Sequence, residues 1–196
     1  MKSQLNRVRV GPPEHYPAFT GPVIDQKAFK KITSAMDAAN KDNNIETIVG
    51  GTYDGSVGYY IDPTIYLSKT PDHELLDREL FGPVLTAYVY PDEDFDGVLD
   101  QIDRQGGGFA LTGNVFANDQ VAIRKAENKL RYAAGNFYVN CKITAAVIGQ
   151  QSFGGARASG TCDKAGSSGL LMRFVAPRTL KEEYPKLDEV LYPSNA

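Results

Sequence analysis

The sequence predicts an α/β fold, with an open sheet of mixed or largely parallel strands flanked by helices. Two observations support this prediction. Segments rich in β-branched and aromatic residues alternate with amphipathic segments between residues 45 and 140, as in folds that cover a sheet with helices. The chain of 196 residues also has the length of one domain, and 42% of its residues are hydrophobic, which is enough for a buried core.

The first predicted helix covers residues 25–41. Asp25 is a candidate N-cap, because its side chain can accept hydrogen bonds from the free N–H groups at the start of a helix. Phe29, Ile32 and Met36 then recur at i, i+3 and i+7, which places them on one face. This helix is therefore expected to bury an apolar face.

The remaining elements follow from the same periodicities. Two further helices are predicted, each with an apolar face: residues 94–105, with Phe95, Val98, Leu99 and Ile102 inward, and residues 119–132, with Ala122, Ala126 and Leu130 on one side. Strands are predicted where β-branched and aromatic residues gather, at residues 45–51, 58–67, 84–90, 111–117, 136–140 and 170–177.

Two segments lack such a pattern. Residues 149–169 are rich in glycine and serine and hold almost no aliphatic side chain, which predicts a long loop. Loops of this length inside a compact domain are usually functional or disordered. Residues 177–196 form a charged tail, and no repeat or linker is visible, so residues 1–196 are expected to form a single domain.

Composition argues against several classes of function. The net charge is −3 and the basic residues are scattered, so a nucleic-acid partner is not expected. No apolar run is long enough to span a bilayer, so no membrane role is expected. Two cysteines cannot form a disulfide framework, and the first residues show no secretory or transit pattern. These features favour a cytoplasmic protein.

Four short motifs carry the strongest functional signal. They are ELFGPV at 79–84, LTGNVFA at 111–117, AGNFYVN at 134–140 and FGGARASG at 153–160. In order and spacing they resemble the C-terminal, catalytic-domain portion of the aldehyde dehydrogenase family. The stretch GQQSFGGARASGT is especially similar to the pyrroline-5-carboxylate (glutamate semialdehyde) dehydrogenases, and the resemblance extends over nearly the whole chain.

The resemblance implies roles for individual residues. Glu79 would accept hydrogen bonds from the nicotinamide-ribose hydroxyls, which suits an acceptor-only carboxylate, and Phe81 would pack beside the nicotinamide. Phe153 would line the substrate pocket, with Gly154 and Gly155 allowing a sharp turn behind it. The alternative is that Glu79 is a solvated loop charge and that both phenylalanines are packing residues.

The sequence also departs from the family. It lacks the Gly-Gln-Lys-Cys motif that would supply the nucleophilic thiol, and it lacks a G-x-G-x-x-G dinucleotide-binding motif. The resemblance therefore implies a truncated catalytic domain that uses no cofactor, in which Glu79 and Phe81 are relics. Ala145 and Ala146 stand where the pyrroline-5-carboxylate enzymes carry a Gly-Ser pair that anchors the substrate carboxylate. Binding of that carboxylate is expected to weaken by roughly 1 to 3 kcal/mol.

The leading hypothesis from the sequence is a repurposed enzyme that performs redox-neutral chemistry on a small carbonyl or imine substrate, such as cyclisation, isomerisation, aldol-type addition or dehydration. Asn136 or Asn140 would act as hydrogen-bond donors, and Cys141 or Lys142 as acid, base or nucleophile. An inert, packed Cys141 and a solvated Lys142 are the alternatives. Two other functions stay open: a non-catalytic partner of a full-length dehydrogenase, and a fragment of an NAD-dependent pyrroline-5-carboxylate dehydrogenase. A homodimer is expected for the redox-neutral enzyme and for the non-catalytic partner, and no metal site is expected.

Overall fold

A computed structural model describes residues 2–143, 146–147, 149–184, 190–191 and 193–195. Its helices are α1 (Lys2–Leu5), α2 (Gln26–Ala39), α3 (Glu74–Asp77), α4 (Phe95–Arg104), α5 (Gln120–Lys129) and α6 (Ser168–Leu171). Its strands are β1 (Ile45–Val49), β2 (Tyr53–Asp54), β3 (Tyr60–Ile61), β4 (Thr64–Ser68), β5 (Val84–Tyr88), β6 (Phe109–Ala110), β7 (Thr112–Val115), β8 (Asn136–Val139) and β9 (Ala156–Arg157). Short 3-10 turns cover Asp92–Asp94, Met172–Phe174 and Pro193–Asn195.

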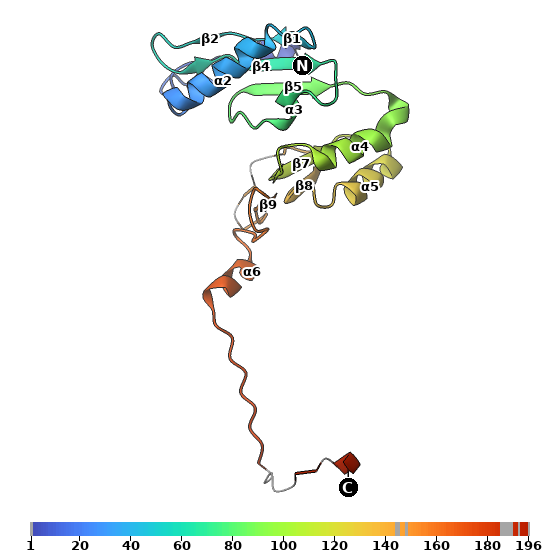
Figure 1. Cartoon of the computed structure of the whole chain (residues 1–196). Coiled ribbons are helices and arrows are strands. Elements are labelled where there is room, and N and C mark those ends of the chain that lie inside the picture. The colour runs from blue at the N-terminus through green and yellow to red at the C-terminus, as the bar shows by residue number, and fades with distance from the viewer. Residues whose placement is uncertain (1, 144–145, 148, 185–189, 192, 196) are drawn as a thin grey trace.

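The predicted mixed α/β architecture is confirmed. A three-stranded sheet has the order β1-β4-β5, in which β1 runs antiparallel to β4 and β4 runs parallel to β5. Helix α2 lies beside this sheet, and helices α4 and α5 lie beside the parallel pair β7–β8 (Figure 1). The strands belong to separate small sheets, with β2 paired to β3 and β6 paired to β9, rather than to one open sheet.

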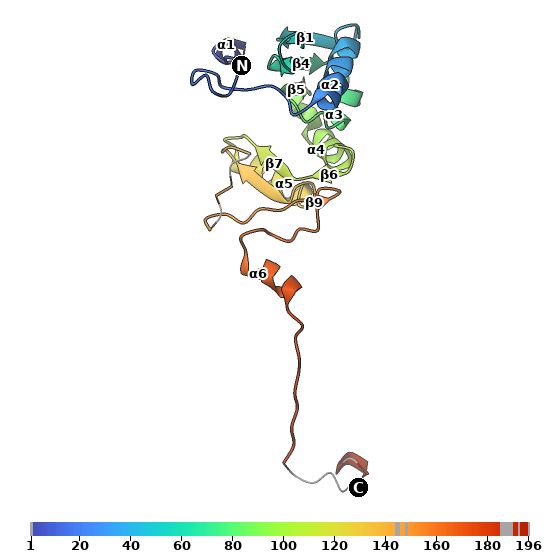
Figure 2. The ribbon, with the colours of Figure 1, turned by 90° about the vertical axis from the view of Figure 1, so that its left-hand side faces the viewer.

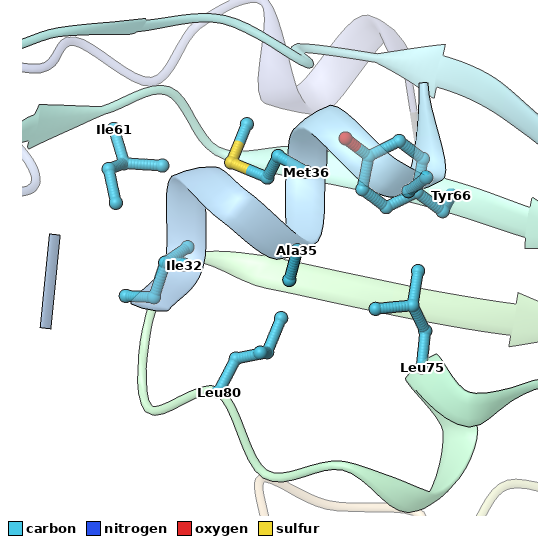
Figure 3. Packing of buried hydrophobic residues seen from close by; sticks show 8 residues of the cluster. Ile32, Ala35, Met36, Ile61, Tyr66, Leu75 and Leu80 are labelled. Carbon is cyan, nitrogen blue, oxygen red and sulfur yellow. The ribbon is translucent and has the colours of Figure 1, made fainter. Parts of the chain in front are cut away.

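Helix α2 begins as the sequence predicts. The Asp25 carboxylate accepts a hydrogen bond from the backbone N–H of Ala28 at 2.7 Å, which satisfies one of the free donors at the helix start. Ile32 and Met36 are fully buried, and Figure 3 shows them facing the side chains contributed by the sheet and by the segment around α3. Burying an aliphatic side chain of this size contributes about 2 kcal/mol, so this face fixes α2 on the sheet.

The same contact explains one motif glycine. A Cβ added at Gly82 would lie 2.5 Å from Cδ1 of Ile32, which is too close for any real side chain. Glycine at this position therefore lets the ELFGPV motif pass close to α2 without displacing the buried Ile32 side chain.

A second apolar cluster lies between α4, α5 and the β7–β8 pair. Its buried members are Leu99, Ala126 and Leu130. The ammonium of Lys125 pairs with the carboxylate of Asp96 at 2.6 Å and joins α5 to α4 on the solvent side. This second region carries three of the four sequence motifs (Figure 2).

Several predictions about single elements were wrong. Residues 58–67 form two strands, β3 and β4, because Pro63 has no N–H for a continuous ladder and the chain changes partner strand there. Ile102 is 46% exposed rather than inward. Ile123, which the sequence reading did not place on the inner face of α5, is buried instead.

The predicted strand at residues 170–177 is also wrong. Its first half is helical, as α6 and the following 3-10 turn, and no strand of the described residues pairs with it. A strand needs a neighbour to satisfy its backbone, whereas a helical turn satisfies its own, and leucine and methionine favour helix. Beyond this turn, residues 175–184 run away from the two packed regions without forming a helix or strand (Figure 1).

No helix of the described part of the chain combines the length and the apolar character that crossing a bilayer requires.

Candidate functional site

The short loop between α3 and β5 presents Glu79 and Phe81 to solvent. Leu80 points into the core around α2 and is 8% exposed, so its two neighbours point outward. Phe81 is 82% exposed and adopts a left-handed backbone with φ of 61°. The ammonium of Lys31 on α2 donates a hydrogen bond of 2.6 Å to the carbonyl oxygen of Glu79. The loop is therefore held by its main chain, and both side chains remain free of the core.

A hollow of about 310 Å³ adjoins Glu79. It lies between the end of α3, in the first region that packs around α2, and strands β6 and β7, in the second region that packs around α4 and α5. Its lining combines polar and apolar groups: Leu76, Asp77, Arg78, Glu79, Gly106, Phe109, Leu111 and Thr112.

Asn136 fastens the 149–169 loop to strand β8. It is 7% exposed, its amide nitrogen donates to the carbonyl of Ser152 at 3.0 Å, and its amide oxygen accepts from the N–H of Gly154 at 3.1 Å. Both ends of the amide are used. Asn136 thus fixes the backbone on either side of Phe153.

Glycines let this contact close. A Cβ added at Gly135 would lie 2.1 Å from the carbonyl oxygen of Gly154, and one at Gly154 would lie 2.5 Å from the carbonyl oxygen of Asp163. Gly155 is buried and equally restricted, since its Cβ would lie 2.5 Å from atoms of Ser159. The backbones of the two motifs therefore touch at a distance that only glycine permits.

Lys164 and Phe153 complete the loop. The Lys164 ammonium donates to the carbonyl of Gly135 at 2.5 Å and to the carbonyl of Gly154 at 2.6 Å. Phe153 and Ala165 exchange two backbone hydrogen bonds, of 3.0 and 2.8 Å. Phe153 is half-buried.

The far end of the loop is tied to the second region. The Arg157 guanidinium donates to the carboxylate and to the carbonyl oxygen of Asp103, each at 2.5 Å, and the backbone of Ala158 donates to Gly108 at 2.9 Å. The Ser159 hydroxyl accepts from the N–H of Ala110 at 2.9 Å. The Gly/Ser-rich segment is therefore an ordered loop that contains the short strand β9.

One carboxylate in this loop has a shifted pKa. The hydroxyl of Thr161 donates to Asp163 at 2.5 Å, and the guanidinium of Arg173 donates to it at 3.1 Å. Both contacts favour the charged form and lower the pKa of Asp163 below its ordinary value.

The remaining predicted residues lie at the other end of β8. Asn136 and Asn140 are separated by the length of this strand, about 13 Å at the usual rise per residue. The Asn140 amide donates to the carbonyl of Ala117 at 2.8 Å and accepts from its N–H at 2.9 Å. Cys141 and Lys142 follow it and are exposed. No hydrogen bond of the described residues links this group to Phe153.

Ala145 lies outside the described residues. Ala146 is partly buried, and its methyl group offers no hydrogen-bond donor. Among the described residues, no group of three or more histidine, cysteine, aspartate or glutamate side chains could hold a metal ion.

Backbone strain gathers at the motifs. Non-glycine residues with a left-handed backbone are uncommon and often mark functional sites. In the described residues they all lie in a motif or just after one: Phe81, Asn140, Arg157 and Cys162.

Three residues that shape the site were not predicted from the sequence. Lys31, Asp77 and Asp103 act through long-range contacts with backbone or with another loop. The run of three glycines at residues 106–108 was the one local signal, since consecutive glycines indicate a turn that ordinary residues cannot adopt.

Comparison with known proteins gives the family. A model described as the aldehyde dehydrogenase family matches residues 1–179. The chain is 52% identical to the mitochondrial delta-1-pyrroline-5-carboxylate dehydrogenase of Emericella nidulans, over 98% of this chain and 34% of the relative. It is 49% identical to the probable delta-1-pyrroline-5-carboxylate dehydrogenase of Schizosaccharomyces pombe, over 100% of this chain and 36% of the relative.

A solved structure gives the same result. The Delta-pyrroline-5-carboxylate dehydrogenase of Mycobacterium tuberculosis matches with a TM-score of 0.82 and 42% identity, over 100% of this chain and 35% of that chain. The same enzyme is also known bound with NAD, and that structure matches with a TM-score of 0.82. The present chain therefore spans about a third of the length of its relatives.

Proposed function

Because the chain belongs to the aldehyde dehydrogenase family, we propose that residues 1–196 supply a catalytic-domain portion of an NAD-dependent pyrroline-5-carboxylate dehydrogenase. The observation that carries the proposal is the pair Glu79 and Phe81. Phe81 keeps a left-handed backbone and an exposed ring although packing requires neither. A ligand that stacks on the ring would account for the strained backbone and the exposed ring.

This proposal replaces the redox-neutral carbonyl or imine chemistry that the sequence favoured. The relatives support the fragment alternative, because dehydrogenases match the chain over 98% and 100% of its length. They give no support to a redox-neutral reaction.

The described residues fit the nicotinamide end of NAD. When bound, NAD supplies the hydride acceptor for oxidation of an aldehyde to an acid. The Glu79 carboxylate has acceptor lone pairs for two ribose hydroxyls and borders a hollow of about 310 Å³. Phe81 offers an exposed aromatic face one residue beyond Leu80. Lys31 keeps both in place through the Glu79 carbonyl.

At the substrate end, this chain contributes shape more than charge. Phe153 would form a wall, while the polar atoms of Asn136 and Lys164 bond the backbone of Gly154 and its neighbours. Ala146 has no hydroxyl with which to bind a carboxylate. We therefore propose that the substrate is an aldehyde whose own carboxylate is bound weakly on this side.

A chimeric enzyme tests the proposal. The third of the Mycobacterium tuberculosis dehydrogenase that matches this chain would be replaced by residues 1–196, and NADH formation from glutamate semialdehyde would be followed. We expect activity, and we expect Glu79→Ala to raise the KM for NAD about tenfold, the loss of roughly 1.4 kcal/mol from charge-assisted hydrogen bonds.

Restoring the carboxylate anchor provides a second arm. The double change Ala145→Gly and Ala146→Ser should lower the KM for glutamate semialdehyde and leave the KM for an aldehyde without a carboxylate unchanged. A folded chimera that forms no NADH with any aldehyde would contradict the proposed function.

We also propose self-association through the C-terminal segment. Residues 175–184 extend from the packed regions and carry exposed apolar side chains, including Leu180 and Tyr184. Exposed apolar surface often marks a protein–protein contact, and most soluble oligomers are assembled from copies of one chain. Light scattering on the purified chain should give twice the monomer mass, and removal of residues 175–196 should give the monomer.

The compartment is a further proposal. The Emericella nidulans relative is named mitochondrial, whereas the Schizosaccharomyces pombe relative carries no compartment in its name. Two exposed free cysteines, Cys141 and Cys162, favour a reducing compartment, and the cytoplasm is the simplest one. Fluorescence of a C-terminal fusion, compared with a mitochondrial stain, tests this.

A further inference from the structure

We propose that Asp77 is a positioning residue: its carboxylate clamps the glycine turn 106–108 and thereby sets Glu79 relative to the loop that carries Phe153. The inference rests on the proposed function, in which Glu79 and Phe153 serve the same reaction. Nothing in the four motifs includes Asp77 or this turn.

The clamp consists of two hydrogen bonds to one oxygen. Oδ1 of Asp77 accepts from the backbone N–H of Gly106 at 2.7 Å and from that of Gly107 at 3.0 Å. Both glycines are left-handed, with φ of 87° and 60°, and consecutive N–H groups of such a turn form a concave anion site. An ionised carboxylate is the strong partner for this site.

Glycine is required on steric grounds as well. A Cβ added at Gly107 would lie 3.1 Å from the carbonyl oxygen of Asp77, and its left-handed backbone disfavours any other residue. The end of α3 and the turn therefore approach each other backbone to backbone. This contact joins the first packed region to the second.

Both functional loops depart from this junction. Glu79 follows Asp77 by two residues, and both line the hollow of about 310 Å³ together with Gly106. On the other side of the turn, the carbonyl of Gly108 accepts from the N–H of Ala158, within the loop that carries Phe153. A shift of the turn would therefore move the ribose contact and the substrate wall relative to each other.

Amide hydrogen exchange on the 196-residue chain tests the clamp without any ligand. Asp77→Ala should speed exchange at Gly106 and Gly107 at least tenfold, and should also speed exchange at residues 79–81 and 156–158. Asp77→Asn keeps an oxygen acceptor and should stay within about threefold of the parent chain. Asp72→Ala, an exposed aspartate before α3, is the matched control and should change none of these sites.

The chimeric dehydrogenase supplies a readout that a purely structural role would not move. We expect Asp77→Ala to raise the KM for NAD about tenfold while kcat stays within twofold and the midpoint of thermal unfolding changes little. The positioning role would be overturned if Asp77→Asn and Asp77→Ala changed kcat and KM to the same extent. It would also be overturned if exchange became faster only at Gly106 and Gly107.

The two proposals fail in different ways. An inactive but folded chimera sinks the proposed function, while the exchange pattern of the chain still decides the clamp. An active chimera in which Asp77→Ala behaves like Asp72→Ala sinks only the clamp.

Discussion

The two loops that carry the strongest motifs use their side chains in opposite ways. In the loop between α3 and β5, the main chain is held by Lys31 and the side chains of Glu79 and Phe81 face outward. Such a loop is built to present chemical groups.

The 149–169 loop is built to hold a shape. Asn136 on strand β8 bonds the loop backbone at Ser152 and Gly154. Lys164 in the loop bonds the backbone of Gly154 and that of Gly135, just before β8. A motif of polar residues and glycines can therefore mark a scaffold as readily as a set of reacting groups. Four measurements test this difference between the two loops.

The largest effect is expected for Gly135→Ala. The new Cβ would lie 2.1 Å from the carbonyl oxygen of Gly154, so one of the two backbones must shift. We expect a loss of about 3 kcal/mol in the free energy of unfolding, as for overpacked sites that cannot relax. Urea titration measures it. Gly169→Ala is the matched control, because its Cβ meets only the Ser167 hydroxyl at 3.7 Å, and it should change stability little.

Removal of the Lys164 ammonium comes next. Lys164→Met keeps the apolar stem but leaves the carbonyls of Gly135 and Gly154 without this donor. The expected loss is about 2 kcal/mol for two hydrogen bonds from a charged group. The exposed Lys181→Met is the control. If both variants unfold at the same urea concentration as the parent, the loop is held by other contacts.

Phe81→Gly should change the free energy of unfolding in the opposite direction. Glycine adopts the left-handed backbone without steric strain, and this gain exceeds its added entropy cost, so the free energy of unfolding should rise by up to about 1 kcal/mol. Phe116→Gly is the control, because Phe116 is similarly exposed at 73% but has no left-handed backbone, and it should not stabilise. In the chimeric dehydrogenase, Phe81→Gly should weaken NAD binding. A gain in stability together with unchanged NAD affinity would mean that the Phe81 ring neither packs nor contacts NAD, and would contradict the role proposed for it.

The smallest effect is the pH dependence of the 149–169 loop. Thr161 and Arg173 lower the pKa of Asp163, so the folded state binds this proton less tightly than the unfolded state. The contribution of the Asp163 contacts to the free energy of unfolding is therefore present above the ordinary pKa of 3.8. It is lost as the pH falls through the lower pKa of the folded state. Thermal unfolding followed from pH 6 down to pH 2, about the acid range of a carboxylate, should show a weaker pH dependence for Asp163→Asn. Identical curves would mean that this ion pair does not hold the loop.

Local sequence determined much of the fold. The Asp25 cap and the 3.6-residue spacing of Ile32 and Met36 gave α2, and β-rich segments gave the main strands β1, β4, β5, β7 and β8. Such elements satisfy their own periodicity, so they can be read without knowing their neighbours. Gly154 and Gly155 also indicated a sharp turn behind Phe153, but not the backbone contacts that the turn makes.

The tertiary structure alone decided how strands pair, which residues clamp the loops and which groups the motif side chains contact. The segment at 170–177 was predicted as a strand, but it has no partner strand among the described residues and its first half is helical. Asp77 and Lys31 act on atoms 29 and 48 residues along the chain, and Asn136 acts on the carbonyl of Ser152, 16 residues away. Because hydrogen bonds depend on distances between atoms and not on residue spacing, no local pattern encodes these contacts.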